Sequence, residues 1–173
     1  MKTLILVRHA KSSWDNQTLD DFERPLNERG KRDAPRMAQF LKTSGMVPQH
    51  IISSPARRAR KTAKILAEYL LNDASAIELV GDIYEAASAD LFRIARTVED
   101  KVECCMLVGH NPGMTDFAND LINNDNDHIE NIPTTGIVIL NLDLKSWQSV
   151  GEGTAVLRQF MYPDRLPDES RGG

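Results

Sequence analysis

Short apolar runs rich in branched side chains alternate along the chain with longer stretches in which apolar residues recur every three or four positions. The short runs are typical of buried strands, and the longer stretches are typical of helices that bury one face. Strands and helices that alternate in this way indicate an α/β domain. The runs that predict strands are 4–7, 51–52, 77–80, 102–108, 137–142 and 155–161.

Four amphipathic stretches predict helices. They are 27–43, 56–71, a helix that Ser88 begins as N-cap, and one with Asn111 as N-cap and Pro112 as first helical residue. Proline lacks the N–H that a helix interior needs, so we expect the regular part of the first helix to begin just before Pro35. The last two strands flank a turn at 149–153 and are expected to be antiparallel. The predicted fold is a three-layer α/β/α sandwich with a mixed, mostly parallel sheet.

The 173 residues are the length of a single domain. We expect that domain to span residues 1–162. Residues 163–173 hold two prolines, several charged side chains and a Gly-Gly end, so they are expected to form a flexible tail.

Composition excludes several classes of protein. The 21 Lys and Arg against 25 Asp and Glu give a formal net charge of −4, which argues against a nucleic-acid-coating protein. Arg8 interrupts the apolar run 4–7, which is far too short for a signal peptide or a membrane span. We therefore expect no membrane association and a cytoplasmic location. The adjacent Cys104 and Cys105 would point to opposite faces of a strand, so we expect two buried thiols and no disulfide.

Side chains suited to phosphate chemistry follow three predicted strands where each strand ends. Arg8 and His9 follow the first strand, and His110 follows the fourth. The pair Arg57 and Arg58 opens the helix after the second strand. Ligands of open α/β sheets sit at the carboxyl ends of the strands, so these groups are expected to share one pocket.

The helical period distinguishes the two arginines. At about 100° per residue, Arg57, Arg60, Lys61 and Lys64 lie opposite the apolar stripe, whereas Arg58 borders it. We therefore assign Arg58 to the pocket. The basic face has no interleaved aromatic residues and is interpreted as solvated, not as a nucleic-acid site. A milder role, steering an acidic or phosphorylated protein toward the pocket, stays open.

Phosphoryl transfer needs groups of this kind. Guanidinium forks and a histidine donor can bind the phosphoryl oxygens, and a neutral imidazole can attack phosphorus to form a phosphohistidine that water hydrolyses. The two arginines should lower the pKa of His9 and keep it neutral. The sequence contains no nucleotide-binding phosphate loop and no paired carboxylates at metal-ligand spacing after a strand. We therefore expect neither a cofactor nor a catalytic metal.

Three motifs carry these residues: Leu-Val-Arg-His-Ala-Lys-Ser at 6–12, Ser-Pro-Ala-Arg-Arg-Ala-Arg-Lys-Thr at 54–62, and Val-Gly-His-Asn-Pro-Gly at 108–113. In that order they resemble the Arg-His opening, the Ser-Pro-x-x-Arg-Ala-x-x-Thr element and the second-histidine element of the histidine phosphatase superfamily, which also contains the phosphoglycerate mutases. The Arg-His-Ala-Lys-Ser start, the stretch 24–27 and the small size resemble the SixA-type phosphohistidine phosphatases. The resemblance covers about residues 1–162 and implies a phosphoglycerate mutase-like fold.

The resemblance implies roles for individual residues. His9 would be the nucleophile, and Arg8, Arg58 and His110 would form the phosphate pocket. Many superfamily phosphatases protonate the leaving oxygen with a carboxylic acid from the loop before a mid-chain helix. Glu85 lies at about the corresponding place in this sequence. SixA-type enzymes as a group manage without a strong acid, because imidazole can leave already protonated. Glu85 is therefore either the acid or a carboxylate at the pocket rim.

Two further residues near the first motif have less defined roles. Ser12 is close enough to His9 in sequence to touch the phosphate. Trp14 either walls the pocket or closes over the core. His50 and His128 stand in polar contexts and are interpreted as surface residues.

The expected function is that of a metal-independent phosphatase that acts through phospho-His9, with phosphohistidine on a protein as substrate. The helices and edge strand between Arg58 and His110 leave little chain for a substrate-covering lid, which suits a phosphate carried on a protein surface. One alternative is a small-molecule phosphomonoesterase or phosphoglycerate mutase-like enzyme, which would need Glu85 as acid. Another is a non-catalytic phosphate- or phosphoprotein-binding module, against which the pair of histidines argues.

Overall fold

A six-stranded mixed sheet forms the centre of the computed structural model, which describes residues 1–167. Its strands, in chain order, are β1 (Lys2–Arg8), β2 (His50–Ser53), β3 (Ile77–Leu79), β4 (Cys104–Gly109), β5 (Ile137–Leu142) and β6 (Ala155–Met161). Their order in the sheet is β3-β2-β4-β1-β5-β6, and the first four in that order are parallel to one another. Strands β5 and β6 run antiparallel, as predicted.

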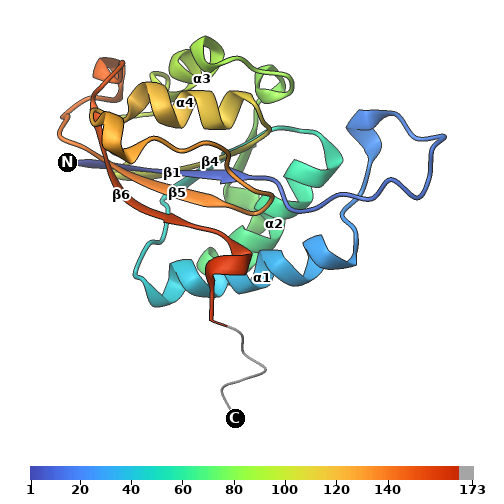
Figure 1. The fold of residues 1–173 in the computed structure, drawn as a ribbon. Coiled ribbons are helices and arrows are strands. Elements are labelled where there is room, and N and C mark those ends of the chain that lie inside the picture. Colours follow the sequence, from blue (N-terminus) through green and yellow to red (C-terminus); the bar gives the residue numbers. More distant parts are fainter. Residues whose placement is uncertain (168–173) are drawn as a thin grey trace.

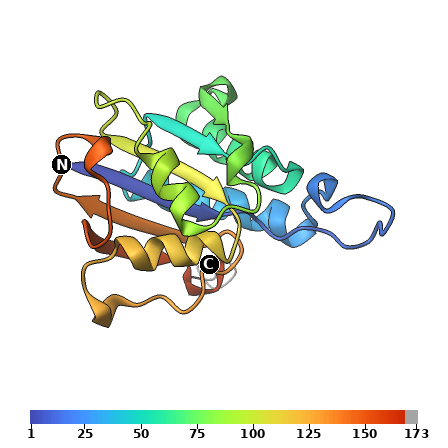
Figure 2. The same ribbon diagram turned by 90° about the horizontal axis from the view of Figure 1, so that it is seen from above.

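Two helical layers enclose the sheet (Figures 1 and 2). Helices α1 (Glu28–Thr43) and α2 (Arg57–Leu71) cover one face, and α3 (Ser88–Ala95) and α4 (Gly113–Leu121) cover the other. The three-layer α/β/α sandwich predicted from the sequence is therefore confirmed.

Strand β1 is buried on both faces, which explains its unbroken apolar run. Leu4 and Leu6 belong to the core under α3 and α4, whereas Ile5 and Val7 belong to the core under α1 and α2. Alternate side chains of a strand point to opposite faces, so a strand covered by helices on both sides is apolar at every position. The central position of β1 places its carboxyl end between the carboxyl end of β4 and the amino end of β5.

The start of α1 differs from the prediction. The helix begins at Glu28, with the Asn27 side chain accepting from the Gly30 N–H, and it continues through Pro35. The expectation that its regular part begins just before Pro35 is wrong. Proline leaves the carbonyl of Lys31 without its usual helical partner. Lys31 is exposed, so water can satisfy that carbonyl and the helix tolerates the proline.

The starts of α3 and α4 also differ in detail. Ser88 is the first residue of α3 and not its cap, because its hydroxyl donates to Asp120, while the Asp90 carboxylate accepts from the Ala87 N–H. Helix α4 begins at Gly113, one residue after Pro112. The Asn111 side chain still accepts from the Thr115 N–H and so satisfies an amide of the first turn.

Other predictions concern the cysteines, the tail and the membrane. Cys105 is buried and Cys104 half-buried, both are free thiols, and burial raises the pKa of Cys104 to about 11. Residues Pro163–Arg165 of the expected tail form a short 3-10 helix, while 168–173 lie outside the described residues. Within residues 1–167, no helix combines the length and apolar composition that crossing a membrane requires.

Candidate active site

The carboxyl ends of β1, β2 and β4 bring the three motifs together at one edge of the sheet. The His9 N–H donates to the Gly109 carbonyl at 3.0 Å, and the Ser54 N–H donates to the Val108 carbonyl at 3.0 Å. These bonds continue the parallel pairing past the strand ends and fix the three loops relative to one another. As a result, the rings of His9 and His110 lie 5.1 Å apart, although 101 positions separate them in the sequence.

The ring of His9 is buried, with 7% of the residue exposed. Its Nδ1 lies 2.8 Å from the Ala10 carbonyl oxygen. A carbonyl oxygen can only accept, so Nδ1 carries the proton and Nε2 keeps a lone pair. The Nε–H of Arg58 points at that lone pair over 3.3 Å. The backbone thus selects the tautomer in which Nε2 is the nucleophilic atom.

Burial lowers the pKa of His9 to about 3, and the neighbouring His110, Arg58 and Arg8 add to this effect against the opposing Ala10 bond. The lowered pKa agrees with the sequence prediction. The main cause differs from the predicted one, because removal of the imidazolium from water outweighs repulsion by the two arginines. His9 is therefore neutral near pH 7, which nucleophilic attack requires.

Arg58 is buried, whereas the adjacent Arg57 is exposed. All three guanidinium nitrogens of Arg58 are engaged, with Nη1 on the Asp21 carbonyl at 2.7 Å and Nη2 on the Asp21 carboxylate at 3.0 Å. Thr62, one helical turn further on, donates to the Arg58 carbonyl and accepts from the Ala10 N–H. This threonine ties the first turn of α2 to the loop that carries His9.

Arg8 and His110 each hold a buried polar atom that has no hydrogen-bond partner in the part of the chain that the structure describes. Arg8 donates from Nη1 to the Ile132 carbonyl at 2.9 Å, and His110 Nε2 lies 2.7 Å from the Ser54 hydroxyl. Within residues 1–167, the buried side-chain atoms without a hydrogen-bond partner are Arg8 Nε, His110 Nδ1 and Thr135 Oγ1. Unsatisfied buried polar atoms are rare, and here two of the three belong to residues assigned to phosphate binding.

Burial also lowers the pKa of His110, to about 4, with repulsion by Arg58 as the next cause. Thr135 contributes through its backbone, since its N–H faces the carbonyls of both Arg8 and His9 at 3.0 and 3.1 Å. Its φ of 61° lies in the left-handed region, which a β-branched residue rarely adopts. This strained turn holds the Arg-His segment in place.

Asp21 was not identified from the sequence, although its exposed carboxylate joins Arg58, Arg24 and Tyr84 in one group of contacts, here called the Asp21 cluster. It accepts from the Tyr84 hydroxyl at 2.6 Å and from Arg58 at 3.0 Å, and it pairs with Arg24 at 3.1 Å. Burial opposes its ionisation, but the bond from Tyr84 and the charge of Arg58 outweigh burial and lower its pKa to about 2. The Tyr84 ring in turn packs edge-on against His110, with centroids 5.5 Å apart.

Comparison with known proteins agrees with this geometry. The model of the histidine phosphatase superfamily (branch 1) matches residues 4–87. An uncharacterized protein of Mycobacterium tuberculosis is 30% identical over 164 residues, which cover 91% of this chain and 99% of that protein. A candidate phosphohistidine phosphatase SixA from Agrobacterium tumefaciens has a solved structure that is 29% identical, covers 94% of this chain and 99% of that chain, and has a TM-score of 0.77.

The chain belongs to the histidine phosphatase superfamily. Within that superfamily it is of the SixA type. An uncharacterized chloroplastic protein of Arabidopsis thaliana is also similar, at 34% identity over 125 residues. That match covers 68% of this chain and 57% of the Arabidopsis protein, so the chain spans little more than half the length of this relative.

The role of Glu85 as a general acid stays a prediction in this histidine phosphatase. Glu85 is exposed, and its φ of 61° turns the backbone sharply after Tyr84. Within the described part of the chain, its carboxylate makes no hydrogen bond to His9, His110 or either arginine of the site. Its place on the loop beside His110 fits a rim carboxylate and leaves the acid role open.

The remaining predicted residues lie around the site. Ser12 is buried and its hydroxyl accepts from Arg24 at 2.8 Å, which links the first motif to the Asp21 cluster. Trp14 does not close over the core, because it is 68% exposed, and it stacks on the Arg24 guanidinium at 3.5 Å. His128 is exposed, and half-buried His50 bonds Glu78.

Proposed function

We propose that this chain is a metal-independent phosphatase that forms a phosphohistidine on His9, and that its substrate is phosphohistidine carried on a protein. Membership of a superfamily of histidine phosphatases supports phosphatase activity. The observation that carries the mechanism is the His9 tautomer, with Nδ1–H on the Ala10 carbonyl and the Nε2 lone pair beside the Arg58 guanidinium.

The first step transfers the phosphoryl group to the enzyme. The Nε2 lone pair of His9 attacks phosphorus, and the bond between phosphorus and the substrate imidazole breaks with its electron pair moving to that imidazole. Arg8, Arg58 and His110 bind the phosphoryl oxygens, on which charge accumulates. The His9 ring becomes positive as the new bond forms, and the Nδ1–H bond to the Ala10 carbonyl stabilises that charge.

The second step restores the enzyme. Water attacks the phosphorus of phospho-His9, the Nε2 bond breaks, and the electron pair returns to Nε2. Nδ1 keeps its proton throughout, so His9 is regenerated in the tautomer that began the cycle. The proton released by water leaves with inorganic phosphate or passes to solvent. The depressed pKa of His9 favours this return, because the free ring does not become protonated near pH 7.

Three considerations favour phosphohistidine over a phosphate ester. An imidazole leaving group needs no proton from the enzyme if it arrives protonated, whereas an alkoxide does. Among the described residues, the exposed Glu85 carboxylate makes no hydrogen bond to the histidines or arginines of the site. The similarity to a candidate phosphohistidine phosphatase at 29% identity supports the same substrate class.

Trapping the intermediate tests the proposal. The wild type, His9→Ala and an exposed control, His128→Ala, are mixed with radiolabelled phosphoramidate in the presence of a chelator and quenched in alkali, in which phosphohistidine survives. We expect label on the wild type and the control and none on His9→Ala. Equal labelling of all three proteins would overturn the assignment of the nucleophile.

A panel of substrates tests the proposal that the substrate is phosphohistidine carried on a protein. The kcat/KM values for a phosphohistidine protein, phosphoramidate, an aryl phosphate and phosphoglycerate are compared with chelator present. The phosphohistidine protein should give the highest value. A higher value for phosphoglycerate or the aryl phosphate would support the small-molecule alternative, and no turnover of any substrate would support the binding module.

A further inference from the structure

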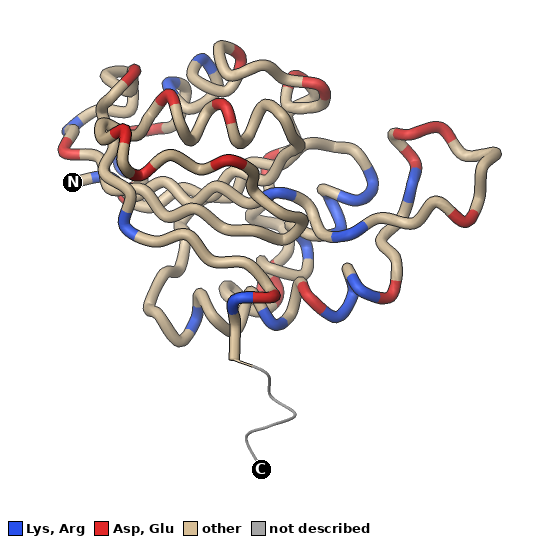
Figure 3. The backbone as a smooth tube through the Cα atoms, in the orientation of Figure 1, with Lys and Arg blue, Asp and Glu red and all other residues tan. Residues whose placement is uncertain are grey.

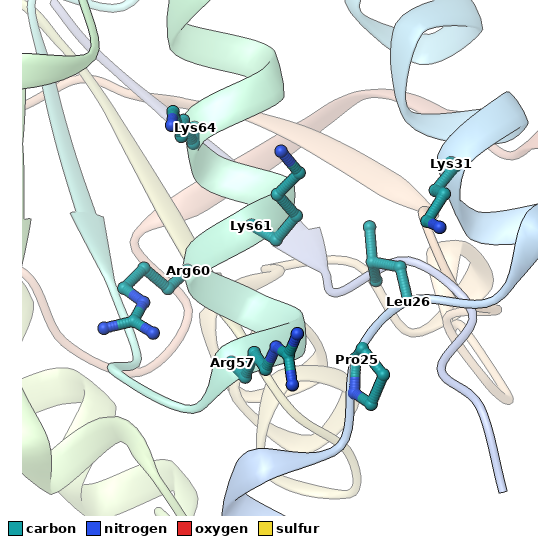
Figure 4. Close-up of a pocket in the computed structure, with 7 residues that line it drawn as sticks. All are labelled: Pro25, Leu26, Lys31, Arg57, Arg60, Lys61 and Lys64. Carbon is teal, nitrogen blue, oxygen red and sulfur yellow. The ribbon is translucent and has the colours of Figure 1, made fainter. Parts of the chain in front are cut away.

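A groove of about 530 Å³ lies between the first part of α2 and the loop that leads into α1 (Figure 4). It is distinct from the histidine site, since neither His9 nor His110 lines it. The residues that line it are Pro25, Leu26, Lys31, Arg57, Arg60, Lys61 and Lys64. Five of these seven side chains are cationic, and all five cations are exposed.

The groove concentrates positive charge in a chain whose net charge is −4. Arg57, Lys61 and Lys64 follow one another at helical spacings of four and three, so like charges repel along one face of α2. Within residues 1–167, the only groove cation in a salt bridge is Lys31, which pairs with Glu28 at 3.4 Å. Helix α4, by contrast, carries acidic residues and no lysine or arginine (Figure 3).

The groove begins beside the candidate active site. Arg57 and Arg58 are adjacent, and they contact the two ends of the same short 3-10 helix, Asp21–Glu23. Arg58 binds Asp21, while Arg57 donates to the Glu23 carbonyl at 3.4 Å. From Arg57 to Lys64 the helix rises about 10 Å. The line of cations therefore leads away from the phosphoryl site over the length of a few residues of extended peptide.

We propose that this basic groove binds an acidic segment of the phosphoprotein substrate while its phosphoryl group enters the histidine site. The proposal rests on the proposed function and adds to it a determinant of substrate choice. Carboxylates of the segment would pair with the unmatched cations of α2, and Pro25 and Leu26 offer an apolar wall for the chain between them. Such pairing steers association and fixes the orientation of the bound partner.

A nucleic acid fits these observations less well. Single-stranded nucleic acids are bound by basic grooves that also present aromatic side chains for base stacking, and none of the groove residues is aromatic. The net negative charge of the chain also repels a long polyanion that extends past the groove. A short acidic peptide contacts only the groove, and this difference makes the two partners separable by experiment.

Binding of a fluorescein-labelled octaglutamate peptide, followed by anisotropy at low salt, tests the groove directly. The double variant Lys61→Gln/Lys64→Gln should weaken binding about twofold or more, since each exposed ion pair contributes a factor of about 1.4 to 5. The control Lys42→Gln/Lys145→Gln removes the same charge from exposed positions outside the groove and should leave the dissociation constant unchanged. Hydrolysis of phosphoramidate should be the same for all three proteins, which shows that each is folded.

Kinetics then connect the groove to catalysis. Two phosphohistidine peptides that differ only in four flanking glutamates or glutamines should differ in kcat/KM for the wild type, and the groove variant should lose most of that preference. If neither peptide is hydrolysed, the proposed function fails. The octaglutamate measurement still tests whether the groove binds an acidic peptide. Equal octaglutamate binding by the groove variant and the wild type would overturn the docking proposal, as would tighter binding of a single-stranded oligonucleotide than of octaglutamate.

Discussion

The Nε–H of Arg58 donates to Nε2 of His9 over 3.3 Å. The guanidinium therefore covers the atom that would attack phosphorus and stands beside the point where the new bond forms. During transfer, the same N–H can shift from the lone pair of Nε2 to an oxygen of the incoming phosphoryl group. This one contact thus positions the phosphate-binding guanidinium beside the nucleophilic nitrogen. It depends on the planar shape of the arginine side chain.

Replacing this arginine by lysine keeps the charge and removes the fork. Arg58→Lys should lower kcat/KM for phosphoramidate about 100-fold or more, in the range found when a donor to a developing oxyanion is lost. Arg57→Lys makes the same chemical change one residue away, at an exposed position, and should keep wild-type activity. Comparable losses in the two variants would contradict the assignment of Arg58.

The tautomer of His9 can be measured directly. Its Nδ1–H bond to the Ala10 carbonyl and its pKa of about 3 predict a neutral ring with the proton on Nδ1. Nitrogen-15 NMR of selectively labelled histidine should show this form for His9 from pH 8 down to pH 5. A signal from the Nε2–H tautomer, or from imidazolium at pH 7, would contradict the proposed nucleophile.

The two buried histidines make stability depend on pH. Their pKa values, about 3 for His9 and about 4 for His110, lie below the ordinary value of 6.5. Between pH 6.5 and pH 4 the unfolded chain therefore binds more protons, and the free energy of unfolding falls as the pH is lowered. Each histidine contributes about 1.4 kcal/mol per pH unit. Urea titrations at several pH values should show a shallower slope for His9→Gln than for the wild type.

Glu85 separates the two classes of substrate. If it protonates an alkoxide or phenoxide leaving group, Glu85→Gln should lower kcat/KM for an alkyl or aryl phosphate about 100-fold. Phosphoramidate should be hydrolysed at nearly the wild-type rate, because its leaving nitrogen is already protonated. Parallel assays of both substrates measure the split, and unchanged hydrolysis of both would assign Glu85 to the pocket rim. An equal collapse of both activities would contradict the leaving-group argument.

Close packing of two backbones positions Tyr84 beside His110. A Cβ on Gly113 would collide with the Ala86 carbonyl oxygen. Gly113→Ala should therefore push the loop at 84–87 away from α4 and lower the free energy of unfolding by about 1–3 kcal/mol, with a loss of activity. Gly81→Ala is the matched control, since its added Cβ meets no heavy atom of the described chain within 4 Å. Thermal unfolding of both variants makes the comparison.

The strand ends and the choice of Arg58 could be predicted from the sequence, because both follow from periodicity. Apolar runs locate the parallel strands, and the 100° step of a helix turns Arg58 inward and Arg57 outward. The Asp21 cluster could not be predicted in this way. Its contacts join residues 37 and 63 positions apart through loops whose sequence has no period. Ser54 could be recognised in the sequence because it opens the second motif, but its bond to His110 is seen only in the folded structure.

The predicted starts of the helices at Pro35 and Ser88 are wrong for a related reason. Proline at position 35 and serine at position 88 are local signals for a helix start, and in both cases a specific contact overrides the local preference. The Asn27 cap lets α1 begin before the proline, and the Asp120 carboxylate takes the Ser88 hydroxyl. Tertiary partners of this kind are not visible in single-residue propensities.

The sheet has consequences for how the protein can be handled. The candidate catalytic side chains lie at or after the carboxyl ends of strands, whereas β1 begins at Lys2 on the opposite edge. Seven residues of extended chain put about 20 Å between that edge and His9. A bead, dye or surface attached before Met1 would leave the histidine site and the basic groove facing solution. The immobilised chain should therefore hydrolyse the proposed phosphoprotein substrate as readily as the free chain does.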